Sequence, residues 1–219
     1  MTFSPKIMFL RPAEIEGAAN ELLRKYGASR GTPVEPPVPV DDIIELHLKI
    51  DLAYVDLVAT LGMKDVLGAT WFDEKKIRIE ESLETQEGRL FFTMAHEVGH
   101  WILHRPQYEA DKVTLPLFKK EAESQPPAIV CRSSQRKEPA EWQADQFAAY
   151  LLMPAQFVRR GFQQATGKET IPVTNESALR KMAADVIEAS GCSNVSNEAM
   201  RIRLTTLKLV GDGRQQTMT

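Results

Sequence analysis

The sequence has few cysteines, no strong excess of one charge and no long apolar segment, and each absence excludes a class of protein. Two cysteines are too few for a disulfide framework in 219 residues. The longest apolar run, residues 147–155, contains a proline and falls well short of the roughly 20 residues that a membrane-spanning helix needs. The 27 basic and 30 acidic residues give a net charge of −3, which provides no general attraction to nucleic acid. Because the N-terminal residues also lack the pattern of a secretory signal, we expect a cytoplasmic protein that binds neither membranes nor nucleic acid directly.

The spacing of apolar residues divides the chain into three predicted parts. Residues 1–30 hold an N-terminal helix, residues 31–165 form the main domain, and residues 166–219 form a helical segment packed on that domain. The predicted helices cover residues 13–26, 41–48, 85–103, 139–152, 154–161, 176–189 and 197–209. Two short β-prone runs, residues 69–72 and 77–79, predict an antiparallel hairpin. Residues 104–138 show no period and are expected to form a long irregular loop.

The predicted helix 85–103 contains an H-E-x-x-H pentad, His96 to His100. Residues four apart lie on one helical face, about 5–6 Å from each other, so both imidazoles can reach one Zn²⁺. Glu97 then lies beside the metal and can take a proton from a zinc-bound water, which prepares that water to attack a carbonyl. The pentad alone is only suggestive, since it occurs by chance in roughly one chain of this size in 200. A third protein ligand is therefore needed.

The predicted helix 139–152 supplies that ligand, since it carries Glu141 and Asp145 one turn apart. We assign Glu141 to the zinc ion, because catalytic zinc usually has three protein ligands and one open position. Asp145 can accept the free N–H of a ligating imidazole and so fix its orientation. The remaining candidates for the third ligand are Glu138, Asp145 and His104.

Two stretches of the chain resemble the ImmA/IrrE family of zinc metallo-endopeptidases. They are RLFFTMAHEVGH at residues 89–100 and EWQADQFAAYLLMP at residues 141–154. The resemblance implies an α+β, zincin-like fold of the thermolysin type, with a small antiparallel sheet on the H-E-x-x-H helix and a mostly helical C-terminal part. It also implies a zinc-dependent endopeptidase that cleaves a helix-turn-helix repressor or an antitoxin-like protein.

Several other residues have both a functional and a simpler interpretation. His104 lies one turn after His100 and could contact substrate or an oxyanion, but such a histidine more often binds a carbonyl at a helix end. Tyr150 is a second, weak oxyanion candidate. Cys131 could occupy the open zinc position as an inhibitory thiolate, although a free cysteine without a metal role is commoner. Arg203 and its basic neighbours on helix 197–209 could read DNA, but packing of that helix is favoured.

We therefore predict that His96, His100 and Glu141 bind zinc, that Glu97 is the general base and that Asp145 orients a ligand. The substrate is expected to add as an extended strand to residues 69–72 or 77–79. The alternatives are a module that docks a transcription factor without cutting it, and a DNA-binding regulator with a structural zinc. The intact general base argues against the first, and the lack of a fourth ligand in register argues against the second.

Overall fold

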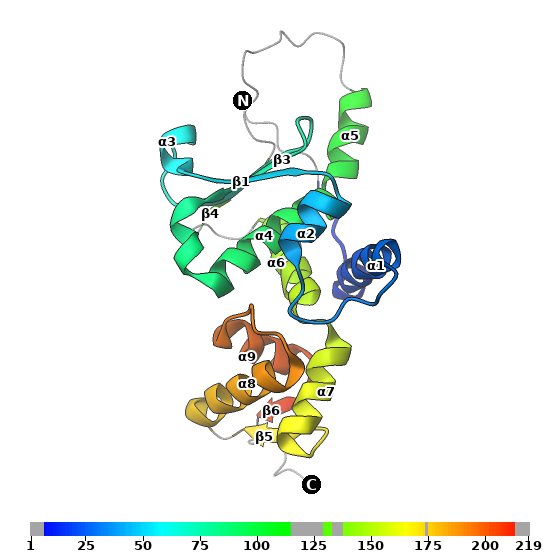
Figure 1. Ribbon diagram of the computed structural model, residues 1–219, viewed down its shortest axis with the longest axis vertical. Helices are drawn as coiled ribbons and strands as arrows, with labels where there is room; N and C mark the ends of the chain where they lie inside the picture. The colour runs from blue at the N-terminus through cyan, green and yellow to red at the C-terminus, as the bar shows by residue number, and fades with distance from the viewer. Residues whose placement is uncertain (1–6, 115–128, 133–137, 174, 213–219) are drawn as a thin grey trace.

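The structure is a computed structural model that describes residues 7–114, 129–132, 138–173 and 175–212. A small sheet and the helices around it form one end of the molecule in Figure 1, and the last three helices form the other end. The helices are α1 (Pro12–Arg30), α2 (Val40–Asp42), η1 (Ile43–His47), α3 (Leu57–Leu61), η2 (Glu81–Thr85), α4 (Glu87–Leu103), α5 (Arg105–Thr114), α6 (Pro139–Leu152), α7 (Ala155–Thr166), α8 (Glu176–Ser190) and α9 (Asn197–Thr206). The strands are β1 (Asp51–Val55), β2 (Val66–Trp71), β3 (Lys76–Glu80), β4 (Ile129–Arg132), β5 (Ile171–Val173) and β6 (Val210–Asp212).

The main sheet has the strand order β1-β3-β2-β4. The predicted hairpin is confirmed, since β2 and β3 pair antiparallel with Gly68 opposite Ile79. The prediction of a purely antiparallel sheet is wrong, because β3 inserts between β1 and β2 and runs parallel to β1. Both predicted substrate-binding runs lie in interior strands whose two edges are already paired, so neither can accept an added strand.

The prediction that residues 104–138 form one irregular loop is wrong in part. These residues include α5 and the strand β4, which pairs antiparallel with β2. A strand of four residues is too short to show a period, and only its pairing with β2 defines it. The chain therefore returns to the sheet between its two predicted site helices.

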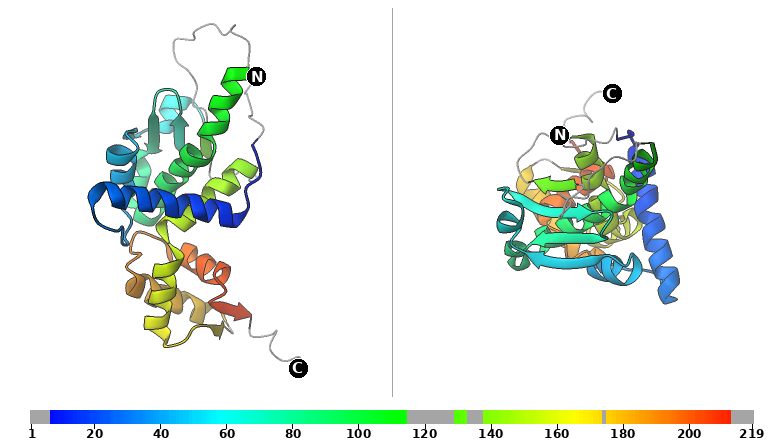
Figure 2. Two further views of the ribbon diagram at one scale, coloured as in Figure 1. Left: turned by 90° about the vertical axis from the view of Figure 1, so that its right-hand side faces the viewer. Right: turned by 90° about the horizontal axis from the view of Figure 1, so that it is seen from above.

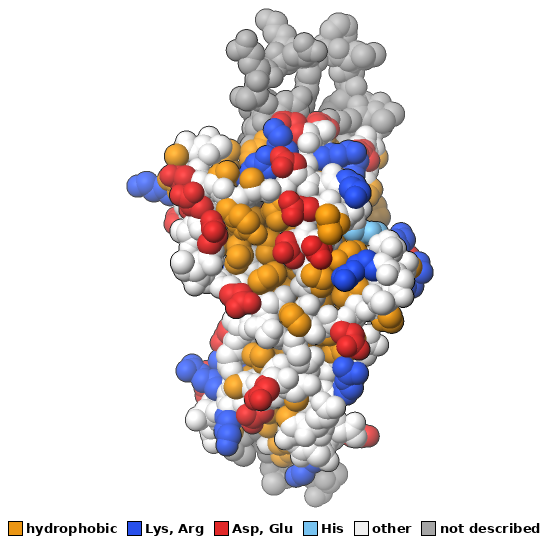
Figure 3. Space-filling view, in the orientation of Figure 1, with side chains coloured by type: hydrophobic (Ala, Val, Ile, Leu, Met, Phe, Trp, Pro, Cys, Tyr) orange, Lys and Arg blue, Asp and Glu red, His pale blue; other side chains and the backbone are white. Residues whose placement is uncertain are grey.

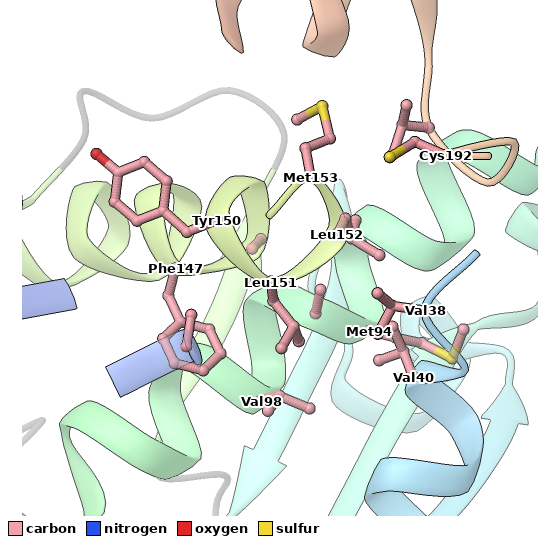
Figure 4. Packing of buried hydrophobic residues seen from close by; sticks show 14 of the residues in the cluster. Val38, Val40, Met94, Val98, Phe147, Tyr150, Leu151, Leu152, Met153 and Cys192 are labelled. Atoms are coloured by element: carbon pink, nitrogen blue, oxygen red, sulfur yellow. The ribbon is translucent and has the colours of Figure 1, made fainter. Parts of the chain in front are cut away.

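The helix α4 lies between the sheet and α6 (Figures 1 and 2). Its apolar side chains Met94 and Val98 belong to the buried cluster that also holds Phe147 and Leu151 of α6, and Met94 lies beside Val38 and Val40 (Figure 4). This packing explains why the helix is apolar on more than one face: one side meets the strands and the other meets α6. Both predicted site helices are confirmed, and they are direct neighbours.

Two helices extend beyond their predicted ends at residues 26 and 161, because the glycine at each predicted end does not terminate the helix. Helix α1 continues past Gly27, where an added Cβ would lie 2.9 Å from the Thr32 carbonyl oxygen, and ends at Arg30, before the C-cap Gly31. Helix α7 continues past Gly161, which packs against Ser190 of α8, and ends before Gly167. In the interior of each helix the glycine permits close packing, whereas the C-cap residues Gly31 and Gly167 have positive φ.

Two further boundaries shift slightly. The helix predicted from Asp41 begins instead at Val40, after Pro39, and continues as the π-helix η1. The last predicted helix, α9, ends at Thr206 rather than at residue 209. Helix ends differ from predictions in this way because the terminal turn depends on local capping contacts.

The helices α7, α8 and α9, with the parallel pair β5 and β6, lie together beyond the C-terminal end of α6 (Figure 1). The apolar face of α9 packs against the rest of the molecule, as was favoured for this helix, with Met200 and Leu204 fully buried. Arg203 is also buried, and its guanidinium donates to the Met153 carbonyl oxygen at 3.0 Å and to Glu16 of α1 at 2.5 Å. This arginine therefore ties α9 to α1 and α6, and it is not available on the surface.

The surface seen in Figure 3 carries acidic, basic and hydrophobic side chains interspersed. None of the helices among the described residues has both the length and the apolar character that crossing a bilayer requires.

Candidate metal centre

The structure brings His96 and His100 of α4 together with Glu141 of α6. One ligand atom from each of the three lies within 4.8 Å of the others. The two Nε2 atoms are 2.9 Å apart, and the Glu141 carboxylate oxygens lie 3.4 Å from His96 Nε2 and 3.3 Å from His100 Nε2. Both histidines are buried, and Glu141 is partly exposed. Three potential ligands from two helices thus point to one place.

The close approach of α4 and α6 positions Glu141 beside the histidines. At the crossing, Gly99 faces Ala144, and an added Cβ on Gly99 would lie 3.1 Å from the Ala144 Cα. Two small residues thus let the helix backbones come close together. Glu141 lies nearly one turn before Ala144 and so reaches the imidazoles of His96 and His100.

The donor set fits a divalent metal ion. Metal–ligand bonds of about 2.0–2.2 Å in a tetrahedron imply ligand atoms roughly 3.3 Å apart, close to the separations among these three residues. Two nitrogens with one carboxylate suit a transition metal, whereas Ca²⁺ would need six to eight oxygens. Three protein ligands also leave one position for a water molecule or a substrate.

The electrostatics of the site favour the protonation states that bind metal. Burial lowers the pKa of His100 to about 3, so its imidazole is neutral near pH 7. Burial alone would raise the pKa of Glu141, but the hydrogen bonds with His100 and His96 outweigh it and lower the pKa, so this carboxylate is ionised. A neutral imidazole and an ionised carboxylate both have lone pairs to give to a metal.

Glu97 is completely buried, and its carboxylate points toward β2. The Thr70 hydroxyl donates to Glu97 Oε2 at 2.5 Å, and the absence of a side chain at Gly68 leaves the space that Oε1 occupies. Among the described residues, Oε1 has no hydrogen-bond partner. Burial raises the pKa of Glu97 to about 7, against the opposing effects of His96 and Thr70. This carboxyl group is therefore able to exchange a proton near neutral pH.

The sequence comparison agrees with this geometry. The family model described as the IrrE N-terminal-like domain, Peptidase M78, matches residues 59–181, which is more than half of the chain. The chain belongs to the Peptidase M78 family. This confirms the resemblance to the ImmA/IrrE metallopeptidases. The matched range runs from α3 into α8 and includes all three potential metal ligands. No curated protein matches the chain.

Asp145 lies where its predicted role requires in the M78 domain. Its Oδ1 is 2.9 Å from His96 Nδ1, one turn along α6 from Glu141. Because a carboxylate only accepts, the imidazole donates from Nδ1, and its Nε2 keeps a lone pair facing Glu141 and His100.

The alternative third ligands of the M78 domain lie elsewhere. Glu138 is exposed at the N-cap of α6. His104 is buried, with its Nδ1 2.9 Å from His100 Nδ1 and its Nε2 3.1 Å from Gln143 Oε1. The expectation that its ring would bind a helix-terminal carbonyl is wrong, since both ring nitrogens face side chains. His104 therefore has no ring nitrogen left to contact an oxyanion.

The other candidates are not part of this group. Tyr150 donates from its hydroxyl to Gln146, and its ring lies under the Arg203 guanidinium. The side chain of Cys131 lies outside the described residues.

Three residues in contact with the site were not found from the sequence: Thr70, Gly68 and Gln143. The first two come from β2, and only the folding of the sheet onto α4 brings them to Glu97. Gln143 follows Glu141 by two positions, a spacing that predicts no shared helical face. Buried glutamines are uncommon, however, and only the structure shows that Gln143 is buried beside the site.

Proposed function

We propose that this chain is a cytoplasmic zinc-dependent endopeptidase with a zincin-like, thermolysin-type active site. The observation that carries the proposal is the buried Glu97 carboxyl next to a group of two histidines and one glutamate. A site that only bound metal would have no use for a completely buried acid with an unpartnered oxygen. A buried carboxyl group whose pKa is near 7 can instead serve as a general base.

His96, His100 and Glu141 would hold the zinc ion, with His96 oriented by Asp145. Zinc would supply Lewis-acid polarisation of the peptide carbonyl and acidification of a water molecule. Glu97 takes the proton of the attacking water and passes it to the leaving amine nitrogen. The Thr70 hydroxyl holds Oε2 of Glu97, which leaves Oε1 to carry that proton.

The substrate is proposed to bind as an extended strand along β4. This strand ends the order β1-β3-β2-β4, so one of its edges has no partner strand among the described residues. It pairs with the segment of β2 that contacts Glu97, with Thr70 opposite Ile129 and Gly68 opposite Cys131. An added strand there would lie two strand spacings, about 10 Å, from the backbone of β2. Main-chain pairing would hold a peptide straight, as cleavage of one bond requires.

We propose a helix-turn-helix repressor or an antitoxin-like protein as the substrate, on the basis of the family resemblance. The test mixes wild-type protein, Glu97→Gln and the matched control Glu138→Gln with a helix-turn-helix repressor encoded beside this gene. Glu97→Gln keeps the shape of the side chain but removes the base. We expect it to capture the repressor and to retain zinc while cleavage falls by 10²–10⁴-fold.

The control Glu138→Gln changes an exposed glutamate on the same site helix and should cleave like wild type. Fragments that form equally fast with Glu97→Gln would refute the role of the base. Repressor control that is unchanged in cells carrying Glu97→Gln would identify docking, rather than cleavage, as the function.

A further inference from the structure

A line of buried polar groups runs from His100 away from the potential metal position. His100 Nδ1 lies 2.9 Å from His104 Nδ1, and His104 Nε2 lies 3.1 Å from Gln143 Oε1. Gln143 Nε2 in turn donates to the Met8 carbonyl oxygen at 2.9 Å. The three side chains are each 0–1 % exposed, so bulk water does not reach them. The line joins α4 to α6 and to the segment that precedes α1.

The end of the line sets the direction of every hydrogen bond in it. The Met8 carbonyl can only accept, so the Gln143 amide must donate to it and present its oxygen to His104. His104 then carries its proton on Nε2, and a neutral His104 has only a lone pair on Nδ1. That lone pair requires a proton on His100 Nδ1, which leaves His100 Nε2 bare.

In the absence of metal, nearby acceptors favour the opposite tautomer of His100, with the proton on Nε2. Glu141 Oε1 lies 3.3 Å and His96 Nε2 2.9 Å from His100 Nε2, and either atom would accept a proton from it. With both Nε2 atoms bare, their lone pairs face each other until a metal ion binds between them. With its proton on Nε2, His100 could not bind a metal until the proton left. The tautomer would also set two lone pairs, on Nδ1 of His100 and Nδ1 of His104, against each other, or force the same mismatch further along the line. An unsatisfied buried acceptor pair of this kind is costly.

We propose that His104 and Gln143 are positioning residues that hold His100 in the tautomer with Nε2 free for the metal, with the Met8 carbonyl fixing the direction. Asp145 does the same for His96 through a single carboxylate. The two histidine ligands are thus oriented by different means: a charged acceptor for one and a neutral line of hydrogen bonds for the other. This inference rests on the proposed function only in taking zinc as the metal.

The anchor of the line is itself held in place. The Met8 amide donates to Gln107 Oε1 of α5 at 2.9 Å, and the Phe9 ring stacks on Trp142 of α6 with 6.1 Å between ring centroids. The segment before α1 is therefore fixed to α5 and α6. Without such contacts the Met8 carbonyl would be free to turn away from Gln143.

The test compares His104→Leu with His104→Asn in the full-length protein. Both remove the imidazole, but the Asn side chain still offers an oxygen near the position of Nδ1, whereas Leu offers none. Zinc affinity is measured by competition with a chromophoric chelator. We expect His104→Leu to bind zinc about 10–100-fold more weakly than wild type and His104→Asn to recover most of the loss. Equal affinities in wild type and His104→Leu, or equal losses in the two variants, would overturn the proposal.

A second measurement does not depend on metal binding. The nitrogen chemical shifts of the imidazoles in metal-free protein distinguish the two tautomers. We expect His100 to be protonated on Nδ1 in wild type and to shift toward Nε2 in Gln143→Met, which keeps both histidines and removes the amide. A wild-type His100 protonated on Nε2 would refute the inference. Wild-type protein that binds no zinc would instead refute the proposed function, and the tautomer measurement would still decide this one.

Discussion

Asp145 Oδ1 lies 2.9 Å from His96 Nδ1, and Glu141, one turn earlier on the same helix, lies 3.4 Å from His96 Nε2. One face of α6 thus contacts both nitrogens of a single imidazole on α4. The helix that would supply the carboxylate ligand therefore also orients the histidine that would bind the same metal ion. Any displacement of α6 along α4 would disturb both contacts together.

Replacing Asp145 with Ala should weaken zinc affinity by about 10–100-fold, because the acceptor that orients His96 is lost. Asp145→Asn keeps an acceptor oxygen without the charge and should lose less. Chelator competition measures both, with Asp185→Ala, an exposed aspartate of α8, as the control. An Asp145→Ala protein with wild-type affinity would show that His96 needs no such partner.

The ligand set is tested by the metal content of purified protein. Wild type should hold about one zinc per chain, and His96→Ala, His100→Ala or Glu141→Ala should each lose most of it. The control is Glu138→Ala, which removes an exposed acid from the start of the same helix and should keep the metal. Elemental analysis provides the counts. Full zinc retention by Glu141→Ala would mean that another residue is the third ligand.

The buried Glu97 should make the stability of the metal-free protein depend on pH. Its pKa is about 7 in the folded protein and 4.5 in the reference state, so the folded protein holds this proton over a range where the unfolded chain has lost it. Wild type therefore loses stability, relative to Glu97→Gln, as the pH rises from about 4.5 to 7.

The full difference amounts to roughly 3 kcal/mol, since one pKa unit corresponds to about 1.4 kcal/mol. Urea unfolding of both metal-free proteins across this range measures it. His100 has the opposite dependence on pH, but it is present in both proteins, and its direct contribution cancels in the comparison. A difference that stays constant from pH 4.5 to 7 would show that Glu97 is not desolvated as the structure indicates.

The crossing of α4 and α6 should tolerate no side chain at Gly99. An added Cβ would meet backbone atoms of Ala144 at 3.1 and 3.2 Å, and backbone atoms cannot move aside unless the helix shifts. We expect Gly99→Ala to cost about 1–3 kcal/mol of unfolding free energy and to weaken zinc binding, because Glu141 moves with α6.

Thermal unfolding and chelator competition check the two parts of this prediction. Gly17→Ala is the matched control, since that glycine lies in the interior of α1 with open space around it. The control should leave zinc binding unchanged and should stabilise the protein by up to about 1 kcal/mol through helix propensity. Wild-type zinc affinity in Gly99→Ala would mean that the helix crossing does not control the ligand geometry.

The features that could be predicted from the order of amino acids are those that depend on short-range geometry. The face shared by His96 and His100 follows from a spacing of four residues in a helix, and the place of Asp145 one turn after Glu141 follows from the same rule. The hairpin of β2 and β3 is local too, since a short polar turn joins two β-prone runs. Each of these arrangements is fixed by backbone periodicity before any distant segment is in place.

The other features could not be predicted, because contacts between segments far apart in the chain have no counterpart in local spacing. The parallel direction of β1 depends on β3 entering the sheet beside it, and β4 becomes a strand only through pairing with β2. The burial of Glu97 depends on Gly68 and Thr70, which precede it by more than 25 residues. The direction of the hydrogen bonds behind His100 depends on a backbone carbonyl more than 90 residues away, a relation that only the packed fold creates.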